Sequence, residues 1–574
     1  MRWCSTAAAA VSRETPAARI VPSPRGVPRP ARPERRRSRR VENRNVIRFA
    51  FTVGGFTMLS RFLGMVRDVL TAGVFGTSLA MSSFVVAFRI PNLFRALFGE
   101  GALSSAFVPV FMASRRSEGE AEAWQLARRV VTLVGAVLLG IVALGAAGMS
   151  AALRWPGLGE EAAAVLPLAR IMLPYVFFIC MAALAMAVLN SYQKFSVSAF
   201  TPSLLNLTWI LAILFIVPII RGGPGRQIYG LAWTVFVAGA VQLAYQVPSL
   251  LRVGWRPGLD TDWRDPRVKK VFMLMGPSAL GLAVNQVNVM VNSMIALFGV
   301  GAWAPSALFY AERLIYFPQG ILATALGTVL LPVLSDFAAQ RKHREMREAI
   351  HHGLRTLLFV MTPASVGLFV LAGPVVQMLF ERGAFDANST VLTARALAFY
   401  APGLMVFCLA KVFVPAFYAM QDTRTPVKIG LVGVSLNFTL NVACALTLPE
   451  YWRHAGMAFS TVIAEGFNGL MLAFFLRRRL GPFGLRGILG GLARALAAAA
   501  AMAAVAYCAE RALTTWLYVY LPHKAAQFIG VPAAIALGMA VYFGIARVFR
   551  FPELGFVMEA VRAKKRQKAA GPVA

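Results

Sequence analysis

The sequence predicts an all-α, polytopic membrane protein with about 14 transmembrane helices. Its 574 residues are 58% hydrophobic and only 14% charged, whereas soluble domains are about 45–50% apolar and about 25% charged. The apolar residues form continuous runs of about 20, the length that crosses a bilayer as a helix. Because these runs do not alternate with polar residues, they favour helices over a transmembrane β-barrel.

Fourteen such runs follow one another from Val46 onward. The second, eighth and tenth are long and contain Pro91, Pro318 and Pro415, where we expect kinks. The expected spans are approximately 46–71, 80–112, 130–153, 167–190, 199–220, 228–250, 271–298, 304–335, 354–380, 391–420, 426–448, 455–476, 487–509 and 526–549.

An internal repeat indicates the domain organisation. The segments LPYVFFICMAALAMAVLNSYQ and APGLMVFCLAKVFVPAFYAMQ share the spacing of a Pro, a Cys and a Gln, which are Pro174, Cys180 and Gln193 in the first and Pro402, Cys408 and Gln421 in the second. Each segment is fourth in a run of six spans, so we expect two six-helix lobes related by an axis along the membrane normal. The expected parts are a disordered basic tail (1–45), an N-terminal lobe (46–252), a C-terminal lobe (271–476), two appended spans (487–549) and a basic tail (550–574).

The net charge of +33 is concentrated in particular connections. Those that follow even-numbered spans, such as 252–270, are rich in Lys and Arg, whereas the connection GTSLA has neither. This asymmetry predicts a multi-pass membrane protein with both termini cytoplasmic, and it explains the charge without nucleic acid. Residues 1–45 are either a cytoplasmic tail that touches anionic lipid or the product of an over-extended start site.

The sequence has no catalytic or metal-binding pattern. It contains no P-loop, HExxH or GxSxG motif and no paired carboxylates in a soluble domain. Its five cysteines and five histidines have neither metal-ligand nor disulfide spacing. We therefore expect a transporter rather than an enzyme, with no cofactor and no metal.

Span one carries charged residues at membrane depth. Such a group costs at least about 2.5–3.5 kcal/mol and persists only where it faces a bundle interior or an aqueous cavity. Arg61 and Asp68 are seven residues apart and share a helical face, whereas Arg67 points about 120° away in a straight helix. We expect Asp68 to hold Arg61 or to pair with an arginine of another span.

Spans two and eight add further charge. Asn92 and Arg95 share one face of span two and Glu100 follows between two glycines, while span eight carries Glu312 and Arg313. Because arginines outnumber acids, we predict a cationic cavity for an anionic substrate at the interface of the lobes. The alternative is a salt-bridge network that only holds helices together.

Amide side chains gather in spans seven and eleven. They can coordinate a cation such as Na⁺, but amides more often hydrogen-bond between helices, and we expect no intramembrane carboxylate beside them. Both interpretations stay open. The residues are Asn285, Gln286, Asn288, Asn292, Asn437 and Asn441.

Four motifs resemble the MurJ/MviN family of the multidrug/oligosaccharidyl-lipid/polysaccharide exporter superfamily. They are SRFLGMVRD, AFRIPNLFRALFGEGALSSAFVPVF, YAERLIYFPQG and PAFYAMQDTRTPVK, and the resemblance covers most of the chain. It implies fourteen spans in two six-helix lobes, with two extra helices forming a lipid-facing groove. By motif position, the cavity arginines of the family correspond to Arg61, Arg67, Arg95 and Arg313.

This chain departs from the family where acids are common. Ser82 stands where many members have an Asp, and Tyr316 stands where some have an acid three residues after the span-eight arginine. Those acids are then not needed here, or Asp68, Glu100 and Glu312 substitute for them. The acidic sodium ligand that some members have in span seven is not apparent.

The resemblance implies a function. We expect the protein to flip lipid II, the undecaprenyl-pyrophosphate-linked disaccharide-pentapeptide, from the cytoplasmic to the outer leaflet of the bacterial plasma (inner) membrane by alternating access. Its expected partners are lipid II and membrane lipids, with membrane potential or Na⁺/H⁺ coupling as the energy source. One alternative is a flippase for another polyprenyl-pyrophosphate-linked oligosaccharide, or a multidrug antiporter of the same superfamily. The other is a non-transporting membrane scaffold in cell-wall synthesis.

Overall fold

The regular structure of the chain is helical wherever it is described, as the sequence predicts. The computed structural model describes residues 33–99 and 102–555. The chain divides into two units, Met1–Thr52 and Val53–Ala574, and all contacts given below lie within the second unit.

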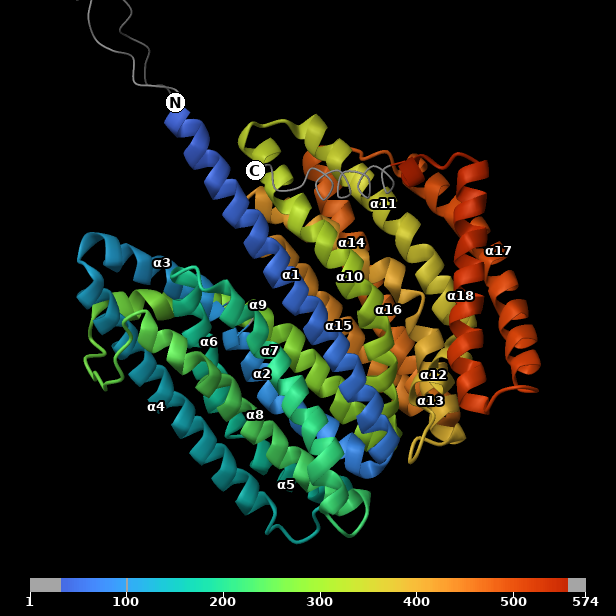
Figure 1. The fold of residues 1–574 in the computed structure, drawn as a ribbon, viewed down its shortest axis with the longest axis horizontal. Helices are drawn as coiled ribbons and strands as arrows, with labels where there is room; N and C mark the ends of the chain where they lie inside the picture. The colour runs from blue at the N-terminus through green and yellow to red at the C-terminus, as the bar shows by residue number, and fades with distance from the viewer. Residues whose placement is uncertain (1–32, 100–101, 556–574) are drawn as a thin grey trace, which may run out of the picture. The chain divides into compact units, whose positions relative to one another are not determined.

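The helices follow the order of the predicted spans (Figure 1). The sequence predicts kinks at Pro91, Pro318 and Pro415, and at each of them the helix (α2, α10 and α14, respectively) continues through the proline. In the described residues the helices are α1 (Pro33–Phe75), α2 (Leu79–Gly99), α3 (Ala102–Ser117), α4 (Glu120–Ala152), α5 (Glu160–Met172), α6 (Tyr175–Ser191), α7 (Phe195–Leu211), α8 (Pro224–Arg252), α9 (Pro266–Ile295), α10 (Ala304–Ala339), α11 (His343–Val370), α12 (Ala372–Phe380), α13 (Ala387–Tyr400), α14 (Gly403–Ala419), α15 (Arg424–Thr447), α16 (Glu450–Leu480), α17 (Leu485–Leu517) and α18 (His523–Val548). Short turns at Ala212–Ile216, Val217–Ile219 and Ala296–Val300 extend α7 and α9.

The helices are long and apolar enough for a multi-pass membrane protein. Over the described residues, ten segments meet this criterion, or twelve if each of two bent helix pairs is one span. Helices α1 and α10 occupy the positions of the predicted first and eighth spans but do not meet it over those residues. The count of fourteen therefore stays a prediction.

The repeat in the sequence has a structural counterpart. Helices α5 and α6 meet at a 41° bend beside Pro174, and α13 and α14 meet at a 45° bend beside Pro402. Beyond α6 and α14, Gln193 and Gln421 both adopt the left-handed conformation, with φ of 58° and 59°. The two segments therefore share the place where the span breaks and the way the chain leaves it.

Helix α1 begins earlier than the sequence predicts. It starts at Pro33, so residues 33–45 are helical rather than disordered. Proline is favoured in the first turn because its missing N–H has no helical acceptor there, and the Arg and Glu residues that follow have high helix propensity. The rest of the expected N-terminal tail, and the C-terminal tail from residue 556, lie outside the described residues.

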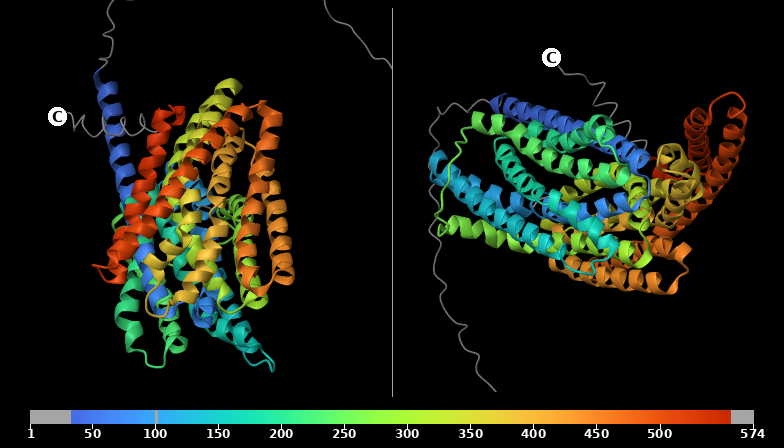
Figure 2. Two further views of the ribbon diagram at one scale, coloured as in Figure 1. Left: turned by 90° about the vertical axis from the view of Figure 1, so that its right-hand side faces the viewer. Right: turned by 90° about the horizontal axis from the view of Figure 1, so that it is seen from below.

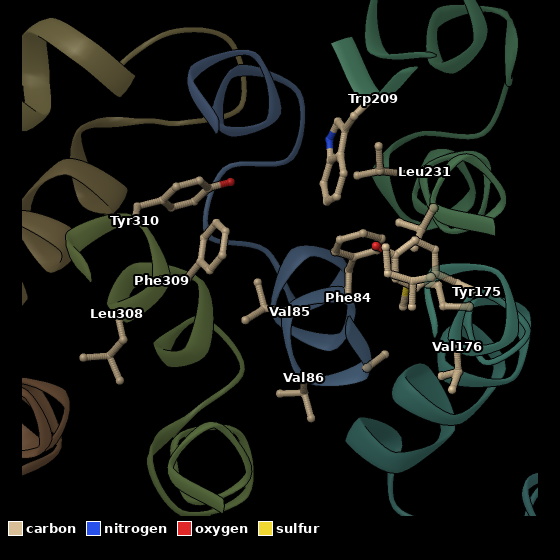
Figure 3. Packing of buried hydrophobic residues seen from close by; sticks show 14 of the residues in the cluster. Phe84, Val85, Val86, Tyr175, Val176, Trp209, Leu231, Leu308, Phe309 and Tyr310 are labelled. Atoms are coloured by element: carbon tan, nitrogen blue, oxygen red, sulfur yellow. The ribbon is translucent and has the colours of Figure 1, made fainter. Parts of the chain in front are cut away.

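Helix α2 lies in the apolar core, where the first half of the membrane region (α1–α8), to which it belongs, meets the second half (α9–α16). Phe84 of α2 packs on Trp209 of α7 with ring centroids 5.3 Å apart. Figure 3 shows Phe309 and Tyr310 of α10 on the opposite side of α2. Helix α9 packs against α2 and α3 as well as α15. Side chains where α2 meets α10 are therefore positioned from both halves.

Helices α17 and α18 form a pair beside α11 and α12 (Figure 2). Ala495, Ala498 and Ala499 of α17 are buried, as expected where small residues let helices approach closely. Arg355 of α11 donates from Nε to Oε1 of Glu553, just beyond α18, at 2.7 Å. This contact ties the end of the pair to the second half.

Candidate functional site

A cavity of about 540 Å³, here called the central cavity, lies between α1, α2, α6, α7, α8 and α10. Among the described residues that line it, four are arginines and Asp68 is the single carboxylate. The cavity is therefore cationic. Of the eight predicted site residues, it brings together Arg61, Arg67, Asp68, Asn92, Arg95 and Arg313.

Arg67 is held by neighbours from two helices. Its Nε and Nη2 donate to Oδ1 of Asp68 at 2.9 and 2.7 Å, and its Nη1 donates to Oδ1 of Asn206 in α7 at 3.0 Å. The guanidinium carbon lies 4.7 Å from the centre of the Trp209 ring. The long side chain thus reaches Asp68 although a straight helical wheel points it away, and it joins α1 to α7.

Asp68 also connects α1 to α10. Its Oδ2 lies 3.4 Å from Nε of Arg313. Of the two partnerships open to Asp68 from the sequence, the structure shows the one with an arginine of another span. Nε of Arg313 is buried and makes no hydrogen bond to a described residue, and its guanidinium stacks 4.5 Å from the Phe309 ring centre. The Arg313 side chain stays 34% exposed, so its guanidinium borders the central cavity as well as Asp68.

Arg61 and Arg95 are partly exposed beside the same space. The guanidinium of Arg61 lies against Gly320 of α10, where it occupies the position that a Cβ would take. Arg95 donates from Nε to Oδ1 of Asn92 at 2.9 Å, which is the i, i+3 pair expected on span two. Because Gly320 has no side chain, the Arg61 guanidinium can occupy this space.

Glu312 lies apart from the central cavity. It lines a second cavity of about 270 Å³ between α2, α9, α10 and α13–α16. Its Oε2 is 3.5 Å from Nη2 of Arg89, and the hydroxyl of Tyr400 donates to its Oε1 at 3.3 Å. Consecutive residues of α10, Glu312 and Arg313, thus serve different cavities, and Tyr316 lines both. Glu100 lies outside the described residues.

The amides of the predicted spans seven and eleven bond to one another. Nδ2 of Asn292 donates to Oδ1 of Asn437 at 2.8 Å, and Nδ2 of Asn441 donates to Oδ1 of Asn292 at 2.7 Å. Oδ1 of Asn441 accepts from the hydroxyl of Ser460. These contacts join α9, α15 and α16, so three of the six amides hold helices together.

Two charged residues of the second cavity escaped the sequence analysis. Lys411 of α14 and Glu465 of α16 line it together with Asn285 and Asn288. The available signal was a lone ionisable residue in each of the apolar segments VFCLAKVFVP and TVIAEGFNGL. Glu465 supplies the intramembrane carboxylate that the sequence analysis did not expect beside the amides. No group of three or more His, Cys, Asp or Glu within the described ranges is placed to hold a metal ion.

Uncharged contacts join the end of α1, the following turn and the start of α2 to the second half. Ser82 and Ser306 of α10 are linked with 2.9 Å between their hydroxyl oxygens. The hydroxyls of Thr77 and Ser389 lie 2.8 Å apart, and the backbone of Gly73 accepts from the N–H of Ala384 at 2.8 Å. Ser82 therefore makes a neutral contact between the halves.

Comparison with known proteins establishes the family. The sequence model of a family described as lipid II flippase MurJ matches residues 71–526. The chain belongs to the lipid II flippase MurJ family. A lipid II flippase MurJ from Burkholderia cenocepacia is 38% identical over 449 residues, which cover 76% of this chain and 84% of that protein. A probable lipid II flippase MurJ from Vibrio cholerae serotype O1 is 34% identical over 519 residues, covering 88% and 96%.

Solved structures of membrane transporters share the fold. Lipid II flippase MurJ in an inward closed conformation matches with a TM-score of 0.68 at 24% identity, covering 88% of this chain and 98% of that one. An inward-facing multidrug resistance MATE transporter of the MOP superfamily matches with a TM-score of 0.63 at 13% identity, covering 76% and 98%. The predicted all-α polytopic architecture is confirmed, and the family is one of membrane transporters rather than enzymes.

Proposed function

We propose that this protein flips lipid II from the cytoplasmic to the outer leaflet by alternating access. The observation that carries the proposal is the central cavity, where four arginines accompany one carboxylate. Inserting an arginine at membrane depth costs free energy, so such residues usually take part in binding or transport. Lipid II carries a pyrophosphate on its head group, and the MurJ relatives are named for this lipid.

The chemistry of the cavity suits a pyrophosphate. A guanidinium presents a planar fork that binds two phosphate oxygens at once, and such charge-assisted hydrogen bonds are short and strong. The Arg313 side chain pairs with Asp68 through Nε and stays 34% exposed, so the rest of its guanidinium is accessible from the cavity. We propose that Arg61, Arg95 and Arg313 bind the head group while the polyprenyl chain stays in lipid. Arg67 and Asp68 position this set, and Asn92 orients Arg95.

Orientation and energy source complete the proposal. From the Lys/Arg-rich connections we propose that both termini of this bacterial plasma (inner) membrane protein lie in the cytoplasm. With the cell interior negative, expelling an anion is downhill by about 2.3 kcal/mol per charge per 100 mV. Membrane potential then biases transport outward, with a coupled Na⁺ or H⁺ as the further energy source.

The alternative functions fit the central cavity less well. An antiporter for cationic drugs needs a cavity dominated by acids, and a non-transporting scaffold needs no cavity arginines. A flippase for another polyprenyl-pyrophosphate-linked oligosaccharide uses the same phosphate chemistry, so an experiment must separate it from lipid II transport.

Complementation tests the proposed function. The chain is expressed in cells depleted of their own lipid II flippase, and the lipid II exposed on the outer leaflet is measured with a reagent that cannot cross the membrane. We expect both growth and outer-leaflet lipid II to be restored. Normal membrane abundance without outer-leaflet lipid II would contradict the proposal, and restored export of a different lipid-linked oligosaccharide would favour the alternative flippase.

A further inference from the structure

The second cavity contains charges that the proposed function leaves unused. Glu312 is satisfied by Arg89 at 3.5 Å and by Tyr400 at 3.3 Å. Glu465 instead has one long hydrogen bond, from Nδ2 of Asn468 at 3.4 Å. No cation of the described part of the chain lies within ion-pairing distance of its carboxylate. The two carboxylates of one cavity therefore have different environments.

The side chain of Asn468, next to Glu465, has a buried oxygen, Oδ1, that lacks a hydrogen-bond donor in the described residues. An ionised carboxylate can only accept hydrogen bonds, whereas a protonated carboxyl group can also donate one. A proton on Glu465 would let the carboxyl group and the amide bond reciprocally, O–H to amide oxygen and N–H to carboxyl oxygen. That removes both an unpaired intramembrane charge and a buried acceptor without a partner.

A sodium ion suits this cavity less well than a proton. A hard cation needs several oxygen ligands, but the amide oxygens of Asn292, Asn437 and Asn441 already accept hydrogen bonds from neighbouring helices. A proton needs one carboxylate oxygen and leaves the amide contacts intact.

We propose that Glu465 is a proton-binding site and that its protonation strengthens binding of the anionic cargo in the central cavity. This inference rests on the proposed function. When Glu465 is ionised, the charges lining the second cavity balance, and protonation leaves one net positive charge. That charge lies behind α10, the helix that presents Arg313 to the other cavity. The titratable and charged groups that line the second cavity with Glu465 are Arg89, Glu312, Tyr316, Tyr400 and Lys411.

The coupling is reciprocal. If a proton on Glu465 strengthens anion binding, then a bound anion must raise the proton affinity of Glu465 by the same factor. Coulomb's law gives about tenfold for one added charge acting across roughly a nanometre of protein. The carrier would thus bind its cargo more tightly on the acidic side of the Glu465 titration.

Infrared difference spectroscopy of the full-length protein in lipid nanodiscs tests the proton site without any cargo. A pH titration should reveal a protonated carboxyl band that disappears in Glu465→Gln and moves in frequency in Glu465→Asp. Glu510→Gln is the control, because Glu510 lies in α17, bonds to Thr514 and lines neither cavity. A titrating band that survives unchanged in both Glu465 variants would overturn the proton site.

Cargo binding tests the coupling. Affinity for undecaprenyl pyrophosphate is measured against pH and, at fixed pH, against Na⁺. As the pH rises and Glu465 loses its proton, wild type and Glu510→Gln should lose about tenfold in affinity. Glu465→Gln should keep the affinity seen at acidic pH over the whole pH range. The same pH dependence in Glu465→Gln, or a Na⁺ dependence that this variant abolishes, would overturn the inference. If the probe binds at no pH while the carboxyl band still titrates, the proposed function fails and the proton site stands.

Discussion

At the scale of single residues, the arginines of the central cavity differ in the contacts they make with neighbouring side chains. Arg67 is only 8% exposed and is bonded to Asp68 and Asn206. Among the described residues, Arg313 pairs with Asp68 alone, and its side chain is 34% exposed. The sequence could identify both residues but could not separate their roles. A helical wheel locates Cβ, not the end of a long flexible side chain.

Replacement of Arg67 should harm the fold. Arg67→Ala leaves Asn206 without its donor and Asp68 with Arg313 alone, and removing one partner of a buried ion pair costs about 3–5 kcal/mol. We expect lower membrane abundance and a lower midpoint of thermal unfolding in detergent. Arg313→Ala is the matched control, because Asp68 then keeps both of its bonds from Arg67. Equal thermal stability of the two variants would show that Arg67 is not structural.

Gly320→Ala should imitate the loss of Arg61. A Cβ at this position occupies the space of the Arg61 guanidinium, which can swing away because it ends a flexible side chain. We expect normal abundance with flipping reduced about tenfold to a hundredfold, the equivalent of one charge-assisted hydrogen bond of about 1.5–3 kcal/mol. Gly367→Ala is the control, since its Cβ meets only Met502 at 3.6 Å. Wild-type transport by Gly320→Ala would exclude a role for Arg61 in this position.

Among the elements, the connection between α8 and α9 is fastened by charges outside the membrane. Asp265 caps α9 by accepting from the N–H of Arg267 at 2.7 Å, and Arg129 of α4 donates to it at 2.5 Å. Arg267 also pairs with Glu118, which follows α3. The two halves of the membrane region are therefore clasped through this connection as well as through their core.

The clasp should depend on pH. Burial alone would raise the pKa of Asp265, but hydrogen bonds from Arg267 and Arg129 outweigh it and lower the pKa to about 2. Since an unfolded Asp has a pKa of about 3.9, its stabilisation is complete above about pH 4 and is lost as the pH falls toward 2. Thermal unfolding midpoints measured from pH 7 to about pH 2 check this.

Two substitutions separate the cap from the charge at Asp265. Asn caps a helix about as well as Asp, whereas Ala removes the cap at a cost of about 0.5–2 kcal/mol. We expect Asp265→Asn to be less stable than wild type at pH 7 and to lose less on acidification, with Asp265→Ala lower still. A wild-type acid response in Asp265→Asn would mean that another carboxylate controls it.

Considered as a whole molecule, the fold was more predictable than the site. A continuous apolar run must be a helix in lipid, so the apolar runs alone predicted a multi-pass helical protein. Arginines at membrane depth stood out for the same reason. The pairing of Asp68 with Arg313, the engagement of the amides and the meeting of Lys411 with Glu465 in one cavity depend on tertiary packing. Helical periodicity in the sequence does not predict which helices pack against one another.

The proposed topology is testable in a cysteine-free background. Tyr520, in the turn between α17 and α18, is 68% exposed, and Ser117 is exposed at the end of α3. Tyr520→Cys should react with an impermeant maleimide in intact cells, whereas Ser117→Cys should react only after permeabilisation. Equal labelling of both positions from outside would rule out the Lys/Arg-based orientation.

The central claim is that cavity arginines bind the pyrophosphate head group. The most direct test measures outer-leaflet lipid II in flippase-depleted cells that express Arg61, Arg95 or Arg313 variants at wild-type membrane abundance. Each Ala variant should leave the outer leaflet without lipid II. Each Lys variant, which keeps the charge but loses the bidentate fork, should restore it at most in part. If all three Ala variants are stable and flip lipid II fully, the arginine-lined cavity is not where the cargo binds.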